Sequence, residues 1–131
     1  MRRSLVDQAV ELGIAFEALL IGGETKEELL ETGKYRAAVL LGGDEPRREQ
    51  SVSEYEHFYD VRSQAVHTGA VDLLREHKVE HVGKLTAPEV VKRAQLLCSL
   101  LIVEIVNRKS FPDWSSIFPK PKDIMRTASL P

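Results

Sequence analysis

The sequence predicts an all-α fold, an antiparallel bundle of four to five helices. Apolar residues recur at spacings of three and four over long stretches, which is the period of an amphipathic helix. Paired glycines and helix-capping residues separate these stretches at short intervals, as in a bundle with short loops. No stretch shows the alternation of apolar and polar residues that is typical of a strand.

The first two helices are expected over residues 4–21 and from Thr25 to Leu41. The apolar residues of the first are Leu5, Ala9, Leu12, Phe16, Leu19 and Leu20. Gly22-Gly23 ends this helix. Thr25 with Glu28 three residues later forms a capping box for the second helix, and Gly42-Gly43 ends it.

The third helix is expected from about residue 46 to residue 67, with Asp44-Glu45 at its start, Pro46 in its first turn and Thr68-Gly69 after it. A short helix around residues 71–76 would be the fifth. Thr86 and Glu89 form another capping box, which opens a helix reaching about residue 108. The apolar run in this last helix, residues 94–106, is too short to cross a bilayer and predicts a buried helix.

Chain length and composition change predict one helical domain over residues 1–109, followed by a docked turn and a proline-rich tail over residues 110–131. This last segment holds four of the six prolines of the chain. Its residues Phe111, Trp114 and Phe118 keep helical spacing for only about two turns. The segment is therefore expected to dock briefly and then to continue as a loose tail.

The charge balance limits the classes of function. The chain has 18 Lys+Arg, 20 Asp+Glu and a net charge of -2, so it is not a polybasic protein that binds nucleic acid by charge alone. Its single cysteine, Cys98, excludes an internal disulfide and suits a reducing compartment. Asp7 and Glu11 interrupt what would be the apolar core of an export signal. A cytoplasmic protein with no membrane partner is expected.

Arg62 is an anomaly in the third helix. At about 100° per residue, apolar residues lie on both sides of it, at about +20° to +80° and about -40° to -100°. They are Val52, Tyr55, Tyr59 and Val66 on one side, and Phe58, Val61 and Ala65 on the other. A buried unpaired guanidinium costs several kcal/mol, so Arg62 must pair with an acid, reach a wet cleft or face another subunit. Glu104 is a candidate partner, whereas Asp60 points about 160° away.

Arg62 and His67 together suit cleavage of an RNA phosphodiester without a metal. Imidazole can move the proton of the 2'-hydroxyl or of the leaving oxygen, while guanidinium holds the phosphate. One chain offers one such histidine, so a symmetric dimer would complete the site. The alternative is structural: Arg62 pairs with a carboxylate on a neighbouring helix, and His67 is an exposed C-terminal residue favoured by the helix dipole.

The stretch "GKYRAAVLLGGDEPRREQSVSEYEHFYDVRSQAVHTG", residues 33–69, resembles the HEPN family and within it the Apea-like branch. The pattern is a helix ending in Arg-Ala-x-x-Leu-Leu, an acidic loop, and a helix closing on Tyr-x-x-Arg-Ser-x-x-Val-His-x-Gly. The matching residues are Arg36, Ala37, Leu40, Leu41, Tyr59, Arg62, Ser63, Val66, His67 and Gly69. Including the first helix, the resemblance covers about residues 5–108.

The resemblance implies a HEPN-like bundle that dimerises through its motif helices and acts as a metal-independent endoribonuclease without a cofactor. Arg62 and His67 would be catalytic, and Tyr59 and Ser63 supporting. The homodimer would act on RNA, as a toxin with an antitoxin partner or within a larger antiviral effector. Ser63 stands where active members often have Asn, Asp or His, and Thr68 separates His67 from the glycine. The alternative is therefore an inactive HEPN module that binds RNA or nucleotide, or only dimerises.

Two further groups of residues are candidates for binding. Arg36, Arg47 and Arg48 would form a basic rim for RNA, or else be solvated charges at helix ends. His57, His77 and His81, with Glu80 or Asp60, lack the tight spacing of a zinc helix, so no metal site is expected. Cys98 is expected to be a core residue.

Overall fold

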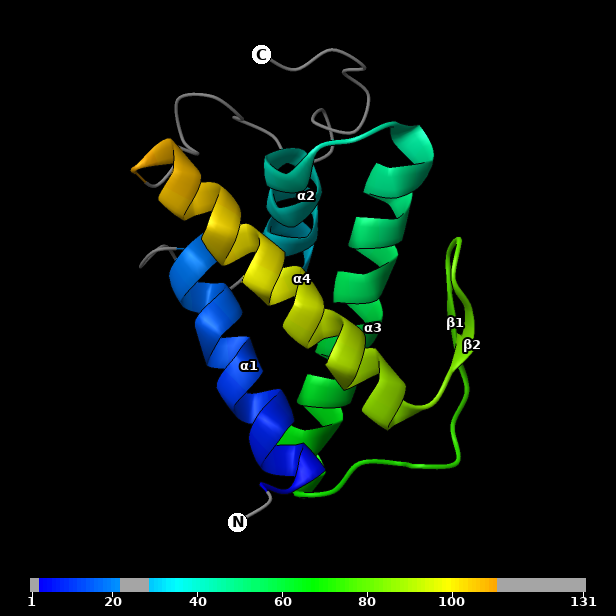
Figure 1. Ribbon diagram of the computed structural model, residues 1–131. Coiled ribbons are helices and arrows are strands. Elements are labelled where there is room, and N and C mark those ends of the chain that lie inside the picture. Colours follow the sequence, from blue (N-terminus) through cyan, green and yellow to red (C-terminus); the bar gives the residue numbers. More distant parts are fainter. Residues whose placement is uncertain (1–2, 22–28, 111–131) are drawn as a thin grey trace.

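Four helices form the bundle in the computed structural model, which describes residues 3–21 and 29–110 (Figure 1). The elements in order are α1 (Leu5–Leu20), α2 (Leu29–Leu41), α3 (Glu45–Thr68), β1 (His77–Val79), β2 (Gly83–Leu85) and α4 (Ala87–Arg108). Each helix contacts the other three. The all-α bundle predicted from the sequence is confirmed.

The central helix is α3, which runs antiparallel to α1 and α4 and also contacts β1 (Figure 1). The aromatic part of the core lies between α1 and α3, where the Phe16 ring is 5.1 Å from the Tyr55 ring and 5.3 Å from the Phe58 ring. These three side chains are almost completely buried. The sequence thus places its largest apolar side chains on the faces where α1 and α3 meet.

The helix ends follow the local signals in the sequence. Ser4 caps α1 by accepting a hydrogen bond from the Asp7 N–H at 3.1 Å, and Asp44 caps α3 in the same way from Arg47 at 3.0 Å. Gly69 ends α3 in the left-handed conformation, with φ 71°. The predicted capping box at Thr25 and the stop at Gly22-Gly23 lie outside the described residues.

The segment between α3 and α4 differs from the prediction. Residues 71–76 are not helical, and β1 and β2 form an antiparallel hairpin in which Lys78 pairs with Lys84. The predictions of a short helix and of no strand were therefore wrong. Strands of three residues are too short to show a period of two. The hairpin is held instead by its contact with α3, where the Glu80 N–H donates to Ser53 Oγ at 3.0 Å.

One face of α4 is buried as expected, and the other is not. Leu97, Leu101 and Ile105 lie in the core, whereas several apolar side chains on the opposite side are exposed. The predicted docked turn and tail lie, apart from Ser110, outside the described residues. Within the described ranges, none of the helices combines the length and the apolar character needed to span a bilayer.

Candidate functional site

Arg62 projects from α3 toward α1, where Gly13 leaves room for it. A Cβ atom at position 13 would lie 2.8 Å from Arg62 Nε and 3.1 Å from its Cγ. Glycine in the middle of a helix costs about 1 kcal/mol relative to alanine, so Gly13 is itself a signal of close packing. Gly13 was therefore a signal in the sequence for the helix that Arg62 contacts.

The charge of Arg62 is neutralised by Glu17 on α1. Arg62 Nη2 lies 3.5 Å from Glu17 Oε1, and Nη1 donates to Tyr59 Oη at 3.4 Å. The guanidinium also lies over the Tyr59 ring, 5.3 Å from its centroid. The partner expected from the sequence, Glu104, is bonded instead to Arg108 one turn along α4, so that expectation was wrong.

The bonds of Arg62 are long, and its guanidinium is incompletely satisfied. Both contacts lie near the upper limit for a hydrogen bond, and the buried Nε atom has no partner within the described part of the chain. The side chain keeps 21% of its surface exposed. Because Nε is buried, an anion can reach only the exposed part of this side chain.

His67 lies exposed on the last turn of α3, in contrast to Arg62. The two residues are about 7.5 Å apart along an ideal helix axis and about 140° apart around it. No hydrogen bond or ion pair joins them among the described residues. A single chain therefore does not bring the two predicted catalytic groups together.

The two supporting residues border a pocket between α2 and α3. Tyr59 and Ser63 line it, and its volume is about 430 Å³. The other lining residues are Leu30, Glu56, His57 and Asp60. Tyr59 thus connects Arg62 on one side with this pocket on the other.

The predicted basic rim is not an exposed surface. Arg36 and Arg48 are buried, and they donate to main-chain oxygens of Leu20 at 2.7 Å and of Gly43 at 2.6 Å. Both bonds fasten the end of one helix to another part of the bundle. Arg47 alone keeps substantial exposure, with 36% of its side chain accessible.

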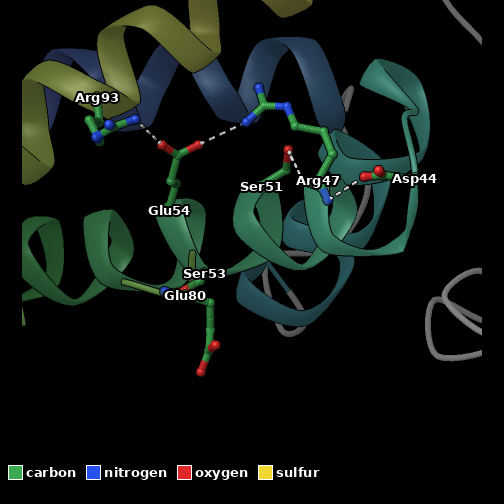
Figure 2. Close-up of polar contacts among 7 residues, drawn as sticks. All are labelled: Asp44, Arg47, Ser51, Ser53, Glu54, Glu80 and Arg93. Atoms are coloured by element: carbon green, nitrogen blue, oxygen red, sulfur yellow. Dashed lines mark hydrogen bonds and ion pairs between the residues drawn. The ribbon is translucent and has the colours of Figure 1, made fainter. Parts of the chain in front are cut away.

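A buried acid on α3 escaped the sequence analysis. Glu54 is almost fully buried between two arginines, and Figure 2 shows its carboxylate pointing to both. Arg93 on α4 bonds Oε2 at 3.0 Å, and Arg47 lies 3.9 Å from Oε1. Its burial could have been predicted from the helical period. Around the axis of an ideal helix, Glu54 lies about 80° from Arg62, in the same apolar sector as Phe58 and Val61.

A histidine pair joins α3 to the hairpin. His57 Nδ1 and His77 Nδ1 are 3.2 Å apart, and His77 is buried. Burial, and then the charge of Arg75 and the proximity of His57, lower the pKa of His77. His81 lies apart from the pair and contacts Glu49. Over residues 3–21 and 29–110, no three His, Cys, Asp or Glu side chains come together in a way that could hold a metal.

Comparisons with known proteins find no match: no family model, curated protein or solved structure is significantly similar to the chain. Functional inference therefore rests on the residues themselves. Two observations can support a function. The first is that Arg62 has only long contacts and lies on the same helix as the exposed His67, and the second is that Arg62 forms an ion pair with Glu17.

Proposed function

We propose that the protein is a metal-independent endoribonuclease of HEPN type that works as a homodimer. The observation that supports this most directly is the state of Arg62. Its side chain is partly exposed, and the contacts of its Nη1 and Nη2 atoms are 3.4 and 3.5 Å long. Because both contacts are longer than an optimal charge-assisted bond, an RNA phosphate that approaches more closely can replace them.

In this reaction the 2'-oxygen of RNA attacks the adjacent phosphorus and the 5'-oxygen of the next nucleotide leaves. One imidazole accepts the proton of the 2'-hydroxyl, and a second gives a proton to the leaving oxygen. The products are a 2',3'-cyclic phosphate and a free 5'-hydroxyl. Arg62 stabilises the charge that develops on the phosphate oxygens.

The homodimer is part of the proposal for two reasons. Each chain has only one His67, and within one chain this residue does not meet Arg62. A two-fold axis beside the last turns of α3 would place the His67 of one protomer near the Arg62 of the other. It would also provide two imidazoles, one for each proton transfer.

The test is cleavage of a labelled RNA in the presence of EDTA. Wild type is expected to cleave, while His67→Ala and Arg62→Ala lose activity and keep the oligomeric state and circular dichroism of the wild type. The matched control is His81→Ala, which removes an exposed histidine of the hairpin and should leave cleavage unchanged. Equal cleavage by wild type and His67→Ala would overturn the proposal.

The second candidate is a non-catalytic HEPN module that binds RNA or nucleotide, or only dimerises. Glu17 favours it, because its carboxylate already neutralises Arg62 and ties α1 to α3. In that case wild type shows no cleavage, and Glu17→Gln lowers stability without creating activity. Retarded migration of RNA in a gel would then separate RNA binding from dimerisation alone.

A further inference from the structure

The pocket between α2 and α3 lies next to the side chain that we assign to the RNA phosphate. Tyr59 lines this pocket and also accepts a hydrogen bond from Arg62 Nη1 at 3.4 Å. Ser63, which directly follows Arg62 in the chain, lines the pocket as well. A phosphate bound by Arg62 would therefore bring a neighbouring part of the same RNA to this pocket.

One face of α3 forms most of the pocket lining. Four of the lining residues recur at spacings of three and four, which places them on one side of a helix: Glu56, Tyr59, Asp60 and Ser63. Glu56 and Ser63 are about 10 Å apart along the axis of an ideal helix. Leu30 adds apolar surface from α2, and the volume of about 430 Å³ is typical of a small-molecule site.

The two carboxylates in the pocket determine which part of a nucleotide it can take. Glu56 and Asp60 each keep 44% of their side chain exposed. Lys34 lies 3.2 Å from one oxygen of Glu56, and Arg75 lies 2.7 Å from one oxygen of Asp60. Because an ionised carboxylate has about four lone-pair sites, both groups can still accept further hydrogen bonds. They repel a phosphate and suit a base that donates N–H groups.

Guanine is the base that fits a carboxylate best. Its Watson–Crick edge carries two adjacent donors, the N1–H and the N2 amino group, which can bond both oxygens of one carboxylate. Adenine and cytosine place an acceptor beside their amino group, and uracil places acceptors on both sides of its N–H. Each of these three bases would therefore direct an acceptor toward a carboxylate oxygen.

Glu56 is the better placed of the two carboxylates. Its contact with a cation is the longer one, 3.2 Å against 2.7 Å for Asp60. It lies six residues before Arg62, about 9 Å along the helix axis. This separation is comparable with the distance between a phosphate and the far edge of a base on the same nucleotide.

We propose that the pocket between α2 and α3 binds a guanine base of the RNA, with the Glu56 carboxylate accepting from N1 and N2. The proposal rests on the proposed function, since it names the substrate class of the same site. It makes the enzyme selective for phosphodiesters next to guanosine.

Binding is tested with RNA that cannot be cleaved. Fluorescein-labelled tetranucleotides with 2'-fluoro groups lack the attacking 2'-hydroxyl, and a set of five carries adenine, cytosine, uracil, guanine or hypoxanthine at one position. Wild type is expected to bind the guanine oligomer about tenfold more tightly than the other four, measured by fluorescence anisotropy. Hypoxanthine is the matched ligand, because it differs from guanine only by the missing N2 amino group.

Glu56→Gln is the matched variant of the protein. It keeps the size of the side chain but replaces one acceptor oxygen with an amide donor, so the guanine oligomer should bind about tenfold more weakly and the adenine oligomer as before. Lys34 keeps its contact with Glu31 at 3.0 Å, and circular dichroism checks the fold. The control is Glu49→Gln, which changes an acid of α3 that contacts His81 instead and should leave the guanine preference intact.

Equal binding of the five oligomers by wild type would overturn the proposal, as would a guanine preference that Glu56→Gln retains. Cleavage of the corresponding unmodified RNAs separates this proposal from the proposed function. Cleavage with no guanine preference in binding refutes the base pocket and leaves the ribonuclease standing. A guanine preference that depends on Glu56, without cleavage, supports the pocket and refutes the ribonuclease.

Discussion

At the residue scale, two residues of α1 accommodate Arg62: a glycine, which has no side chain, and a glutamate, which supplies a negative charge. Gly13 creates the space on α1, and Glu17, one turn later on the same helix, supplies the carboxylate. Together they explain how an arginine occupies the apolar face of α3 without an uncompensated buried charge. The long contacts leave the guanidinium available, which is the basis of the proposed phosphate-binding role.

The second residue of interest at this scale is His77, whose pKa is lowered from the ordinary value of 6.5, chiefly by burial. The folded protein therefore binds fewer protons at this site than the unfolded chain does. The stabilising contribution is complete above pH 6.5 and is lost as the pH falls below it.

We therefore expect the urea concentration at the unfolding midpoint of the wild type to decrease as the pH is lowered from about 7.5 to about 5.5. The reason is that His77 binds a proton more readily in the unfolded chain than in the folded one. His77→Gln removes the group and should reduce this dependence, although it also lowers stability at neutral pH. Urea titrations of both proteins at several pH values measure the two slopes. Identical slopes would show that His77 is not responsible.

At the scale of the elements, α3 organises the bundle through polar contacts as well as through its apolar faces. Arg62 reaches α1, Glu54 reaches α4, and His57 reaches β1. Each contact joins α3 to a different neighbour. Since an unsatisfied polar group in the core is costly, these contacts disfavour helix packings in which the partners do not meet.

The cluster around Glu54 allows this idea to be tested with two matched substitutions. Arg93→Ala removes the 3.0 Å bond and leaves the buried carboxylate with only the longer contact to Arg47. We expect it to lower the free energy of unfolding by about 2 kcal/mol. Arg47→Ala removes the 3.9 Å contact and should cost less than about 1 kcal/mol. Chemical denaturation measures both, and equal costs would contradict the importance of the shorter bond.

At the scale of the whole molecule, the proposed activity depends on assembly. Arg62 faces α1, whereas His67 faces solvent, and helical geometry keeps them about 140° apart within one chain. A symmetric dimer is the simplest arrangement that unites them.

A composite site predicts complementation between two inactive variants. After Arg62→Ala and His67→Ala protomers are mixed and allowed to exchange, the heterodimers contain one intact arginine and one intact histidine. We expect the mixture to cleave RNA faster than either variant alone but more slowly than wild type, because Arg62 and one His67 can meet at one site while water must take the place of the second imidazole. The same amounts kept separate and assayed in parallel are the control. A mixture no faster than its components would indicate that each protomer carries its own site.

Much of the helical architecture was predictable from the sequence. Ser4, Asp44 and Thr86 mark helix starts, and Gly42 and Gly69 mark helix ends, within a residue or so of the observed bounds. These signals are local, since a cap or a periodic stripe depends on residues only a few positions apart. The anomaly at Arg62 was visible for the same reason.

Only the tertiary structure decided which groups meet. Glu17 lies 45 residues before Arg62, and Arg93 lies 39 residues after Glu54, separations at which spacing carries no information about contact. The burial of Arg36, the hairpin at residues 77–85 and the exposed side of α4 depend likewise on how the helices pack. The sequence by itself determined the starts of α1, α3 and α4, the ends of α2 and α3, and which charge is out of place. Their packing determined what that charge binds, because contact between distant residues is a property of the folded chain.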